Sequence, residues 1–173
     1  MARPSVERVE RTAQPSVLDR LIDLDPRAAS DPPPTLAGSL RAVKEAVRRD
    51  LEWLLNTRRT PEPAPPSLPE LEHSVYNYGL PDISSMSQDV ADDRARLLRA
   101  IEQAVATFEP RLADARVSMA EATGADAAHR RELRFVIEAT LRVEPTPERV
   151  AFDTVIEMGS GECRVDDAGA PDA

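Results

Sequence analysis

An eleven-residue run at residues 133–143 alternates between apolar and polar side chains, and it constrains the fold more than any other feature. Every odd position of LRFVIEATLRV is apolar, and the even positions are charged or Thr apart from Val136. This period of two indicates a β-strand with one buried face. The run VAFDTVIEM at residues 150–158 alternates in the same way after an EPTPE turn. The two runs therefore predict an antiparallel hairpin.

Further periodic segments complete the predicted domain. Residues 36–56 and 89–108 each carry a stripe of Leu, Val and Ile at helical spacing. These stripes predict two long amphipathic helices. Residues 114–121, with Val117 and Met119 two positions apart, predict a shorter strand that pairs with the hairpin. The sequence thus predicts an α+β domain with two long helices packed on one face of a small antiparallel sheet.

The prolines divide the chain into a domain with linkers and tails. Twelve of the sixteen prolines fall in four short stretches, and in residues 60–70 so many backbone donors are missing that helix and central strand are excluded. We expect a flexible N-terminus at 1–15, a single domain at 16–158 and a disordered acidic tail at 159–173. Within the domain, residues 25–35 and 60–70 are predicted to be Pro-rich linkers.

The sequence does not determine what two apolar features, a short helix and a tryptophan, pack against. SVLDRLIDL at residues 16–24 predicts a short helix capped by Ser16, and a helix of this length needs a docking surface. That surface is either its own domain or a partner. Trp53 stands off the apolar stripe of the first long helix, so it is either buried where helix meets sheet or exposed as an anchor for a partner.

Composition narrows the compartment and the class of partner. The net charge of −9 disfavours binding to nucleic acid or to an anionic membrane. Cys163 is the only cysteine, so an internal disulfide is excluded and an intracellular location is favoured. No apolar run approaches the roughly 20 residues of a membrane span. We therefore expect a cytoplasmic protein without direct membrane insertion.

Residues that could carry out catalysis are scarce. His73 and His129 have no His or Cys neighbour at ligand spacing, so we expect no metal and no cofactor. Glu109 is the best candidate for a general acid, because burial at the end of a helix raises the pKa of a carboxyl group. Arg111 lies two positions away, however, and this spacing favours a structural salt link. We expect no enzyme.

The edges of the predicted sheet are a second candidate site. A sheet of three strands leaves two edges with unpaired backbone groups. Such an edge is either protected by the chain itself or offered to a strand of another chain. The sequence leaves both alternatives open.

Four segments together resemble the TssE family of baseplate subunits of type VI secretion systems. They are RRDLEWLLNTRR (48–59), SVYNYGLPDI (74–83), FEPRL (108–112) and VAFDTVIEM (150–158). That family is similar in turn to the "lysozyme-like" wedge protein of contractile-tailed phage baseplates. The order and spacing of the segments extend over about residues 16–158.

The resemblance implies assembly with larger wedge subunits. The Glu-Pro-Arg motif of the family corresponds here to Glu109, Pro110 and Arg111. These residues are expected to contact the helical core bundle formed by TssF and TssG, with an indirect link to TssK through the wedge. A charged pair beside a proline suits such a contact.

The resemblance also implies contact with the contractile sheath. The sheet of the family is similar to the handshake region of the sheath subunits TssB and TssC, and it templates the first sheath ring by strand exchange. We place this exchange on the second strand of the hairpin, at Val150, Phe152, Thr154 and Ile156. A peptidoglycan hydrolase that uses Glu109, or an unrelated α+β adaptor, remains the alternative.

Overall fold

The fold is known from a computed structural model of the chain. The structure describes residues 12–22, 26–27, 35–83, 86, 90–120, 132–144 and 146–169.

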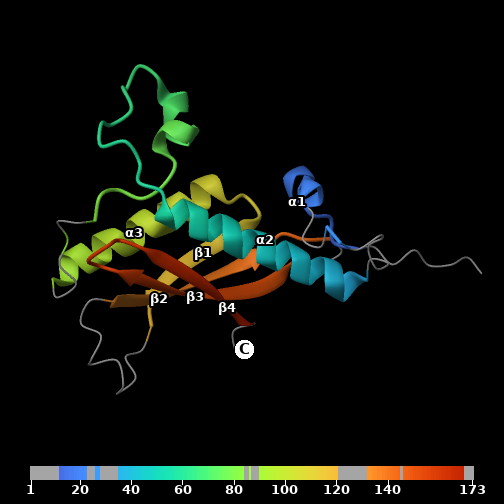
Figure 1. Ribbon diagram of the computed structural model, residues 1–173. Coiled ribbons are helices and arrows are strands. Elements are labelled where there is room, and N and C mark those ends of the chain that lie inside the picture. Colours follow the sequence, from blue (N-terminus) through green and yellow to red (C-terminus); the bar gives the residue numbers. More distant parts are fainter. Residues whose placement is uncertain are drawn as a thin grey trace, which may run out of the picture.

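Two long helices cover one face of a four-stranded antiparallel sheet (Figure 1). The strands follow the order β1-β2-β3-β4 across the sheet. The helices are α1 (Val17–Leu21), α2 (Leu36–Asn56) and α3 (Ala91–Phe108), with the 3-10 helices η1 (Pro69–His73) and η2 (Val75–Asn77). The strands are β1 (Leu112–Met119), β2 (Glu132–Leu141), β3 (Glu148–Glu157) and β4 (Cys163–Gly169). The predicted α+β class, with its short N-terminal helix, is confirmed.

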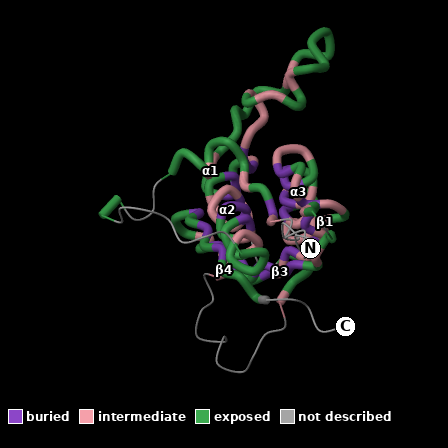
Figure 2. The backbone as a smooth tube through the Cα atoms, turned by 90° about the vertical axis from the view of Figure 1, so that its right-hand side faces the viewer, coloured by how far each residue is buried: buried purple, intermediate pink, exposed green. Residues whose placement is uncertain are grey.

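The core lies between the two long helices and the sheet (Figure 2). Leu51, Leu55 and Ile101 are completely buried on the inner faces of the helices. Phe135, Ile137 and other odd-numbered residues of β2 meet them from the sheet, as the period of two predicts. Burying side chains of this size contributes about 1.5–3 kcal/mol each, so the contact between the helix layer and the sheet holds the fold together.

The predicted hairpin is present in the expected register. β2 and β3 pair over their whole length, from Glu132 opposite Glu157 to Leu141 opposite Glu148. The β1 strand pairs antiparallel with β2 and contains a bulge between Ala113 and Arg116. This predicted third strand begins two residues earlier than the sequence pattern suggests.

The prediction of a disordered tail is wrong for residues 163–169. These residues form β4, which pairs antiparallel with β3 from Cys163 opposite Ile156 to Gly169 opposite Ala151. Cys163 and Val165 are buried against the core, at 2% and 0% exposed. The strand is short and acidic, so its local pattern resembles a tail, and only its pairing partners order it. Residues 170–173 lie outside the described part of the chain.

The prediction of a flexible N-terminus at 1–15 is also wrong near the end of that segment, at Ala13. Ala13 is 2% exposed, and its backbone N–H donates to the Ser39 side chain of α2 at 3.0 Å. The chain is therefore attached to α2 before α1 begins. Residues 1–11 lie outside the described part.

Residues 59–79, which we call the arm, project from the domain between α2 and α3 (Figure 2). The two ends of the arm meet at its base, which we call the neck. Two hydrogen bonds close the neck, from Leu80 N–H to Thr57 C=O and from Arg59 N–H to Leu80 C=O, each 2.9 Å long. Gly79 has φ 107°, and an added Cβ would lie 2.4 Å from the Thr57 carbonyl oxygen. The predicted linker at 60–70 contains no strand and enters η1 at Pro69.

Candidate interaction site

The Glu-Pro-Arg segment forms the corner between α3 and β1. The helix ends at Phe108, Glu109 is its C-terminal cap, and Leu112 N–H donates back to the Glu109 carbonyl at 3.0 Å. Pro110 is exposed at the tip of this turn. Proline has no backbone N–H, and beyond the end of the helix this costs no helical hydrogen bond. The edge-to-face contact of Phe108 with Tyr78, at 5.3 Å between ring centroids, packs the neck of the arm against this corner.

Glu109 and Arg111 form a two-pronged ion pair inside the corner. The Arg111 Nε donates to Glu109 Oε1 at 2.6 Å, and Arg111 Nη2 donates to Oε2 at 2.5 Å. The Glu109 side chain is only 5% exposed, and that of Arg111 is 24% exposed. Paired donors of this kind give short, directional contacts. The predicted structural salt link is therefore present.

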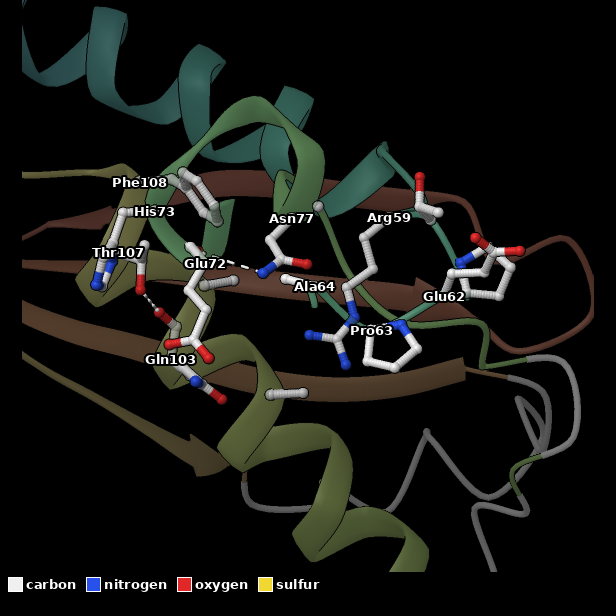
Figure 3. A pocket seen from close by; sticks show the side chains of 15 residues that line it. Arg59, Glu62, Pro63, Ala64, Glu72, His73, Asn77, Gln103, Thr107 and Phe108 are labelled. Carbon is white, nitrogen blue, oxygen red and sulfur yellow. Dashed lines mark hydrogen bonds between the residues drawn. The ribbon is translucent and has the colours of Figure 1, made fainter. Parts of the chain in front are cut away.

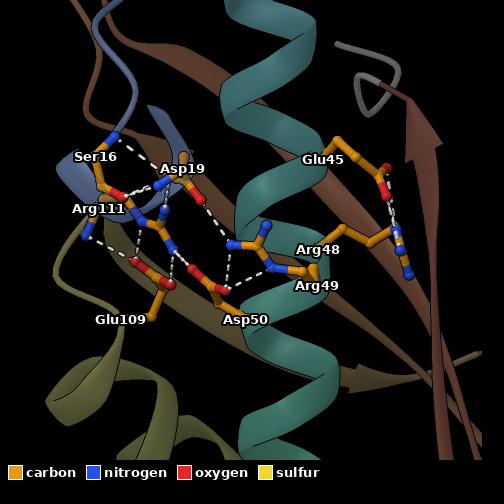
Figure 4. A network of polar contacts seen from close by, with 8 residues as sticks. All are labelled: Ser16, Asp19, Glu45, Arg48, Arg49, Asp50, Glu109 and Arg111. Carbon is orange, nitrogen blue, oxygen red and sulfur yellow. Dashed lines mark hydrogen bonds and ion pairs between the residues drawn. The ribbon is translucent and has the colours of Figure 1, made fainter. Parts of the chain in front are cut away.

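The pair belongs to a larger acid–arginine network, which consists of Asp19, Arg49, Asp50, Glu109 and Arg111 (Figure 4). Arg111 Nη2 also donates to Asp50 Oδ2 at 2.5 Å. Arg49 bridges Asp50, at 2.9 Å, and Asp19, at 2.6 Å. The network thus joins α1, α2 and the α3–β1 corner.

Mutual pairing keeps this network charged. Burial alone lowers the pKa of Arg111, but hydrogen bonds and opposite charges from Glu109 and Asp50 outweigh it and raise that pKa. Burial alone raises the pKa of Asp19, but hydrogen bonds from Ser16 and Arg49 outweigh it and lower that pKa. Both residues therefore remain ionised across the physiological range.

The helix α1 docks on its own domain through this network, which answers one question that the sequence leaves open. Ser16 and Asp19 form a capping box at its start. The Asp19 side chain is 8% exposed, whereas Val17 and Leu21 are 73% and 76% exposed. The helix is thus held by a charge and turns its apolar side chains outward.

Trp53 is exposed, so of the two alternatives that the sequence left open, burial where helix meets sheet is wrong. The role of an anchor for a partner stays a prediction. The Trp53 side chain is 54% exposed, one turn beyond Arg49 on α2. The Arg49 guanidinium lies 5.1 Å from the centre of the Trp53 ring. This cation–π contact places the tryptophan beside the acid–arginine network.

Three other polar residues of the 48–59 segment hold β4. Arg48 Nη1 donates to Val165 C=O at 3.0 Å, and Arg58 Nη2 donates to Gly161 C=O at 2.6 Å. Asn56 exchanges two hydrogen bonds with the backbone of Cys163. Sequence reasoning missed these contacts, although the density of polar side chains on the last turns of α2 was a signal for them.

The opposite edge of the sheet has a single side-chain contact in the described part of the chain. Ala120 N–H donates to Arg134 C=O across the β1–β2 ladder. Alternation along an antiparallel pair therefore turns the backbone groups of Val117 and Met119 outward. Glu102 of α3 accepts the Val117 N–H at 2.9 Å. Met119, which is 41% exposed, has no such contact in the described residues.

The four predicted strand-exchange residues lie on an internal strand. Val150, Phe152, Thr154 and Ile156 are all buried, and β3 is paired on both sides, with β2 and with β4. Their backbone is therefore not at an edge. They are also not part of the corner that holds Glu109, Pro110 and Arg111.

A cavity of about 310 Å³ lies between the arm and α3 (Figure 3). Its wall includes His73, Glu72 and Gln103 but no member of the acid–arginine network. No cluster of three potential metal ligands exists in the described residues. His129 lies outside them. Burial raises the pKa of the Cys163 thiol to about 12, so this cysteine is not a ready nucleophile.

None of the helices in the described ranges is long and apolar enough to span a bilayer. The fold is a small α+β domain whose polar side chains are largely used in internal contacts, while apolar side chains of α1 and Trp53 face solvent. This arrangement is typical of a subunit that works by contact with other proteins.

A model of the family described as baseplate wedge protein gp25 matches residues 41–146, which is more than half of the chain. The chain belongs to this family of structural baseplate subunits. The matched segment contains α2 from residue 41 on, α3, β1, β2 and the Glu109–Arg111 corner, while α1, β3 and β4 lie outside it. Neither the curated proteins nor the solved structures that were compared include a match.

Proposed function

We propose that the chain is a TssE-like baseplate subunit of a type VI secretion system that acts in the cytoplasm without a catalytic role. In this function it binds the wedge subunits TssF and TssG and templates polymerisation of the TssB/TssC sheath. The observation that carries the proposal is the baseplate wedge match over residues 41–146, which includes the Glu109–Arg111 corner.

The corner supports the wedge contact by its rigidity. Glu109 is buried and takes up two nitrogens of Arg111, and Asp50 fixes the guanidinium from α2. Glu109 therefore acts by positioning Arg111, and the partner meets Pro110 together with the remaining exposed part of the arginine. The indirect link to TssK would pass through the same wedge.

The sheet topology favours the β1 edge for an incoming sheath strand. Three outward backbone groups of β4, the N–H and C=O of Cys163 and the C=O of Val165, are bonded to Asn56 and Arg48 of α2, which occupy part of the place of a further strand. On β1, Glu102 covers one donor at Val117, and Met119 is uncovered in the described residues. An added strand at β1 needs to displace one carboxylate only.

Strand exchange at Val150, Phe152, Thr154 and Ile156 remains a second route. It requires β4 to leave β3, and with it the contacts of Arg48 and Asn56. Losing three or more such hydrogen bonds costs about 0.5–1.5 kcal/mol each before any gain from the new strand. We therefore favour β1.

The wedge contact is tested by co-purification with TssF and TssG. Arg111→Ala is expected to abolish the complex while the variant stays folded, as judged by thermal unfolding. The exposed Arg99→Ala, on α3, is the matched control and is expected to bind normally. A folded Arg111→Ala variant that still binds would overturn the assignment of this corner.

The sheath contact is tested by substituting Met119 with Pro. This removes an outward N–H and leaves the β1–β2 ladder intact, so the domain is expected to fold and sheath assembly to fail. Met119→Ala keeps the donor and is expected to support assembly. Normal sheath assembly with Met119→Pro would exclude the β1 edge and favour exchange at β3.

The proposal also excludes hydrolysis. Purified protein is expected to show no turnover of peptidoglycan, because the Glu109 carboxylate is buried against Arg111 and does not line the cavity between the arm and α3. Muralytic activity that is lost in Glu109→Gln would overturn the non-catalytic assignment.

A further inference from the structure

The helix α1 presents an apolar surface that nothing in the described chain covers. Val17, Leu18 and Leu21 are 73%, 58% and 76% exposed, and no residue of the helix is buried. Asp19, the residue that faces inward, reaches Arg49, which in turn stacks on Trp53. Val17, Leu18, Leu21 and Trp53 together form what we call the α1 patch.

The orientation of α1 is the reverse of what burial of apolar area favours. A five-residue helix has little stability of its own, and its inner face contributes an ion pair instead of a hydrophobic contact. Contiguous exposed apolar side chains on a domain surface commonly mark a site of protein contact. The ion pairs hold this patch in a fixed position in the free domain.

Cationic groups border the patch. Arg49 and Arg111 each use Nε and Nη2 for hydrogen bonds to Asp19, Asp50 or Glu109. Within the described residues, neither Nη1 makes a hydrogen bond, and that of Arg111 lies 3.6 Å from Asp19 (Figure 4).

Two of the three carboxylates that neutralise these arginines, Asp19 and Glu109, lie deeper than the guanidinium groups, and Asp50 is about as exposed as they are. The Asp19 and Glu109 side chains are 8% and 5% exposed, Asp50 is 28% exposed, and each arginine is 24% exposed. Arg20 of α1 is exposed as well. The surface therefore offers the apolar side chains of α1 together with the exposed Arg20 and two partly exposed guanidinium groups.

We propose that the α1 patch binds a segment of a wedge partner that carries apolar side chains flanked by carboxylates. The apolar side chains pack on Val17, Leu21 and Trp53, and the carboxylates accept from the Arg49 Nη1 and from the exposed Arg20, beside Arg111. This inference rests on the proposed wedge contact, because Arg111 belongs to both surfaces, and it adds the chemistry of the partner.

The test compares two charges at one exposed apolar position. Leu21→Glu and Leu21→Lys both remove the apolar contact, but only Glu repels an acidic partner. We expect Leu21→Glu to weaken binding to the TssF–TssG complex at least about tenfold more than Leu21→Lys, as measured by titration at low salt. The difference is expected to shrink at high salt.

Matched controls use Val90, which is 46% exposed at the start of α3, away from α1 in Figure 1. Val90→Glu and Val90→Lys are expected to bind like the wild type. Thermal unfolding checks that all four variants are folded. A photoreactive residue at position 21 is expected to cross-link to a partner peptide that contains Asp or Glu beside apolar residues.

The outcomes separate this inference from the proposed function. If Leu21→Glu and Leu21→Lys bind equally well or equally badly, the acidic partner is overturned. If both bind like the wild type while Arg111→Ala does not, the α1 patch is overturned and the wedge contact stands. If Arg111→Ala also binds normally, both fail. Cross-linking of position 21 to a second copy of this chain would overturn the inference in favour of self-association.

Discussion

The side-chain amide of Asn56 is paired with both backbone polar groups of Cys163. Cys163 N–H donates to Asn56 Oδ1 at 2.8 Å, and Asn56 Nδ2 donates to Cys163 C=O at 2.8 Å. This is the pattern that a neighbouring strand would make, so the last turn of α2 closes the outer edge of β4. The contact also explains how a short acidic segment becomes an ordered strand.

Removing this amide should loosen β4. Asn56→Ala leaves two backbone groups of Cys163 without partners, and we expect a loss of about 1–3 kcal/mol in the free energy of unfolding. The Cys163 thiol, buried in the wild type, should react faster with a thiol reagent at neutral pH. Ser118→Ala, which removes an exposed hydroxyl of β1, should change neither quantity. Unchanged thiol labelling in Asn56→Ala would contradict the role of the amide.

The buried carboxylate of Glu109 should matter more for stability than the exposed carboxylate of Glu45. Glu109→Gln leaves Arg111 with Asp50 and the more distant Asp19 as its carboxylate partners. We expect a loss of roughly 2–3 kcal/mol in denaturant unfolding, less than for a fully buried pair because Arg111 is partly exposed. Glu45→Gln breaks a surface pair with Arg48 and should cost less than about 1 kcal/mol. Equal effects of the two substitutions would show that the network contributes little.

The neck of the arm requires glycine at position 79. Gly79→Ala combines a positive φ of 107° with a Cβ 2.4 Å from the Thr57 carbonyl oxygen. We expect it to destabilise the domain by about 2 kcal/mol or more. Gly159→Ala is the matched control, because its nearest neighbour is 3.9 Å away, and it should lie within about 0.5 kcal/mol of the wild type. A neutral Gly79→Ala would mean that the neck rearranges freely.

Docking of α1 should depend on pH through Asp19. The folded pKa of Asp19 is lowered, so its contribution to stability is present above the unfolded value of about 4 and is lost as pH falls through the folded value. Trp53, the only tryptophan, reports on this docking by fluorescence through its contact with Arg49. We expect an acid transition below pH about 4.

Two substitutions test whether Asp19 is the group that controls this acid transition. Asp19→Asn should show at neutral pH the fluorescence that the wild type reaches in acid. Asp92→Asn, at an exposed position of α3, should titrate like the wild type. If Asp19→Asn kept the wild-type transition, another group would control α1.

Local periodicity was sufficient for the main elements. The stripe of residues 36–56 predicted α2 with both bounds correct, and the alternation of residues 133–143 predicted the buried face of β2. Each pattern shows which face of a single helix or strand is apolar. Residues close together in sequence are sufficient to determine that face. The short helix near Ser16 and its cap were predicted for the same reason.

The sequence by itself thus determined the class of fold, the faces of the helices and strands that become buried, and the salt link between Glu109 and Arg111, because each depends on residues a few positions apart. Tertiary structure decided that residues 163–169 form a strand, that Asp50 joins Arg111 across the chain, and that α1 turns its apolar side chains outward. These features depend on groups far apart in sequence, and no local pattern of hydrophobicity or charge specifies which distant partner completes them.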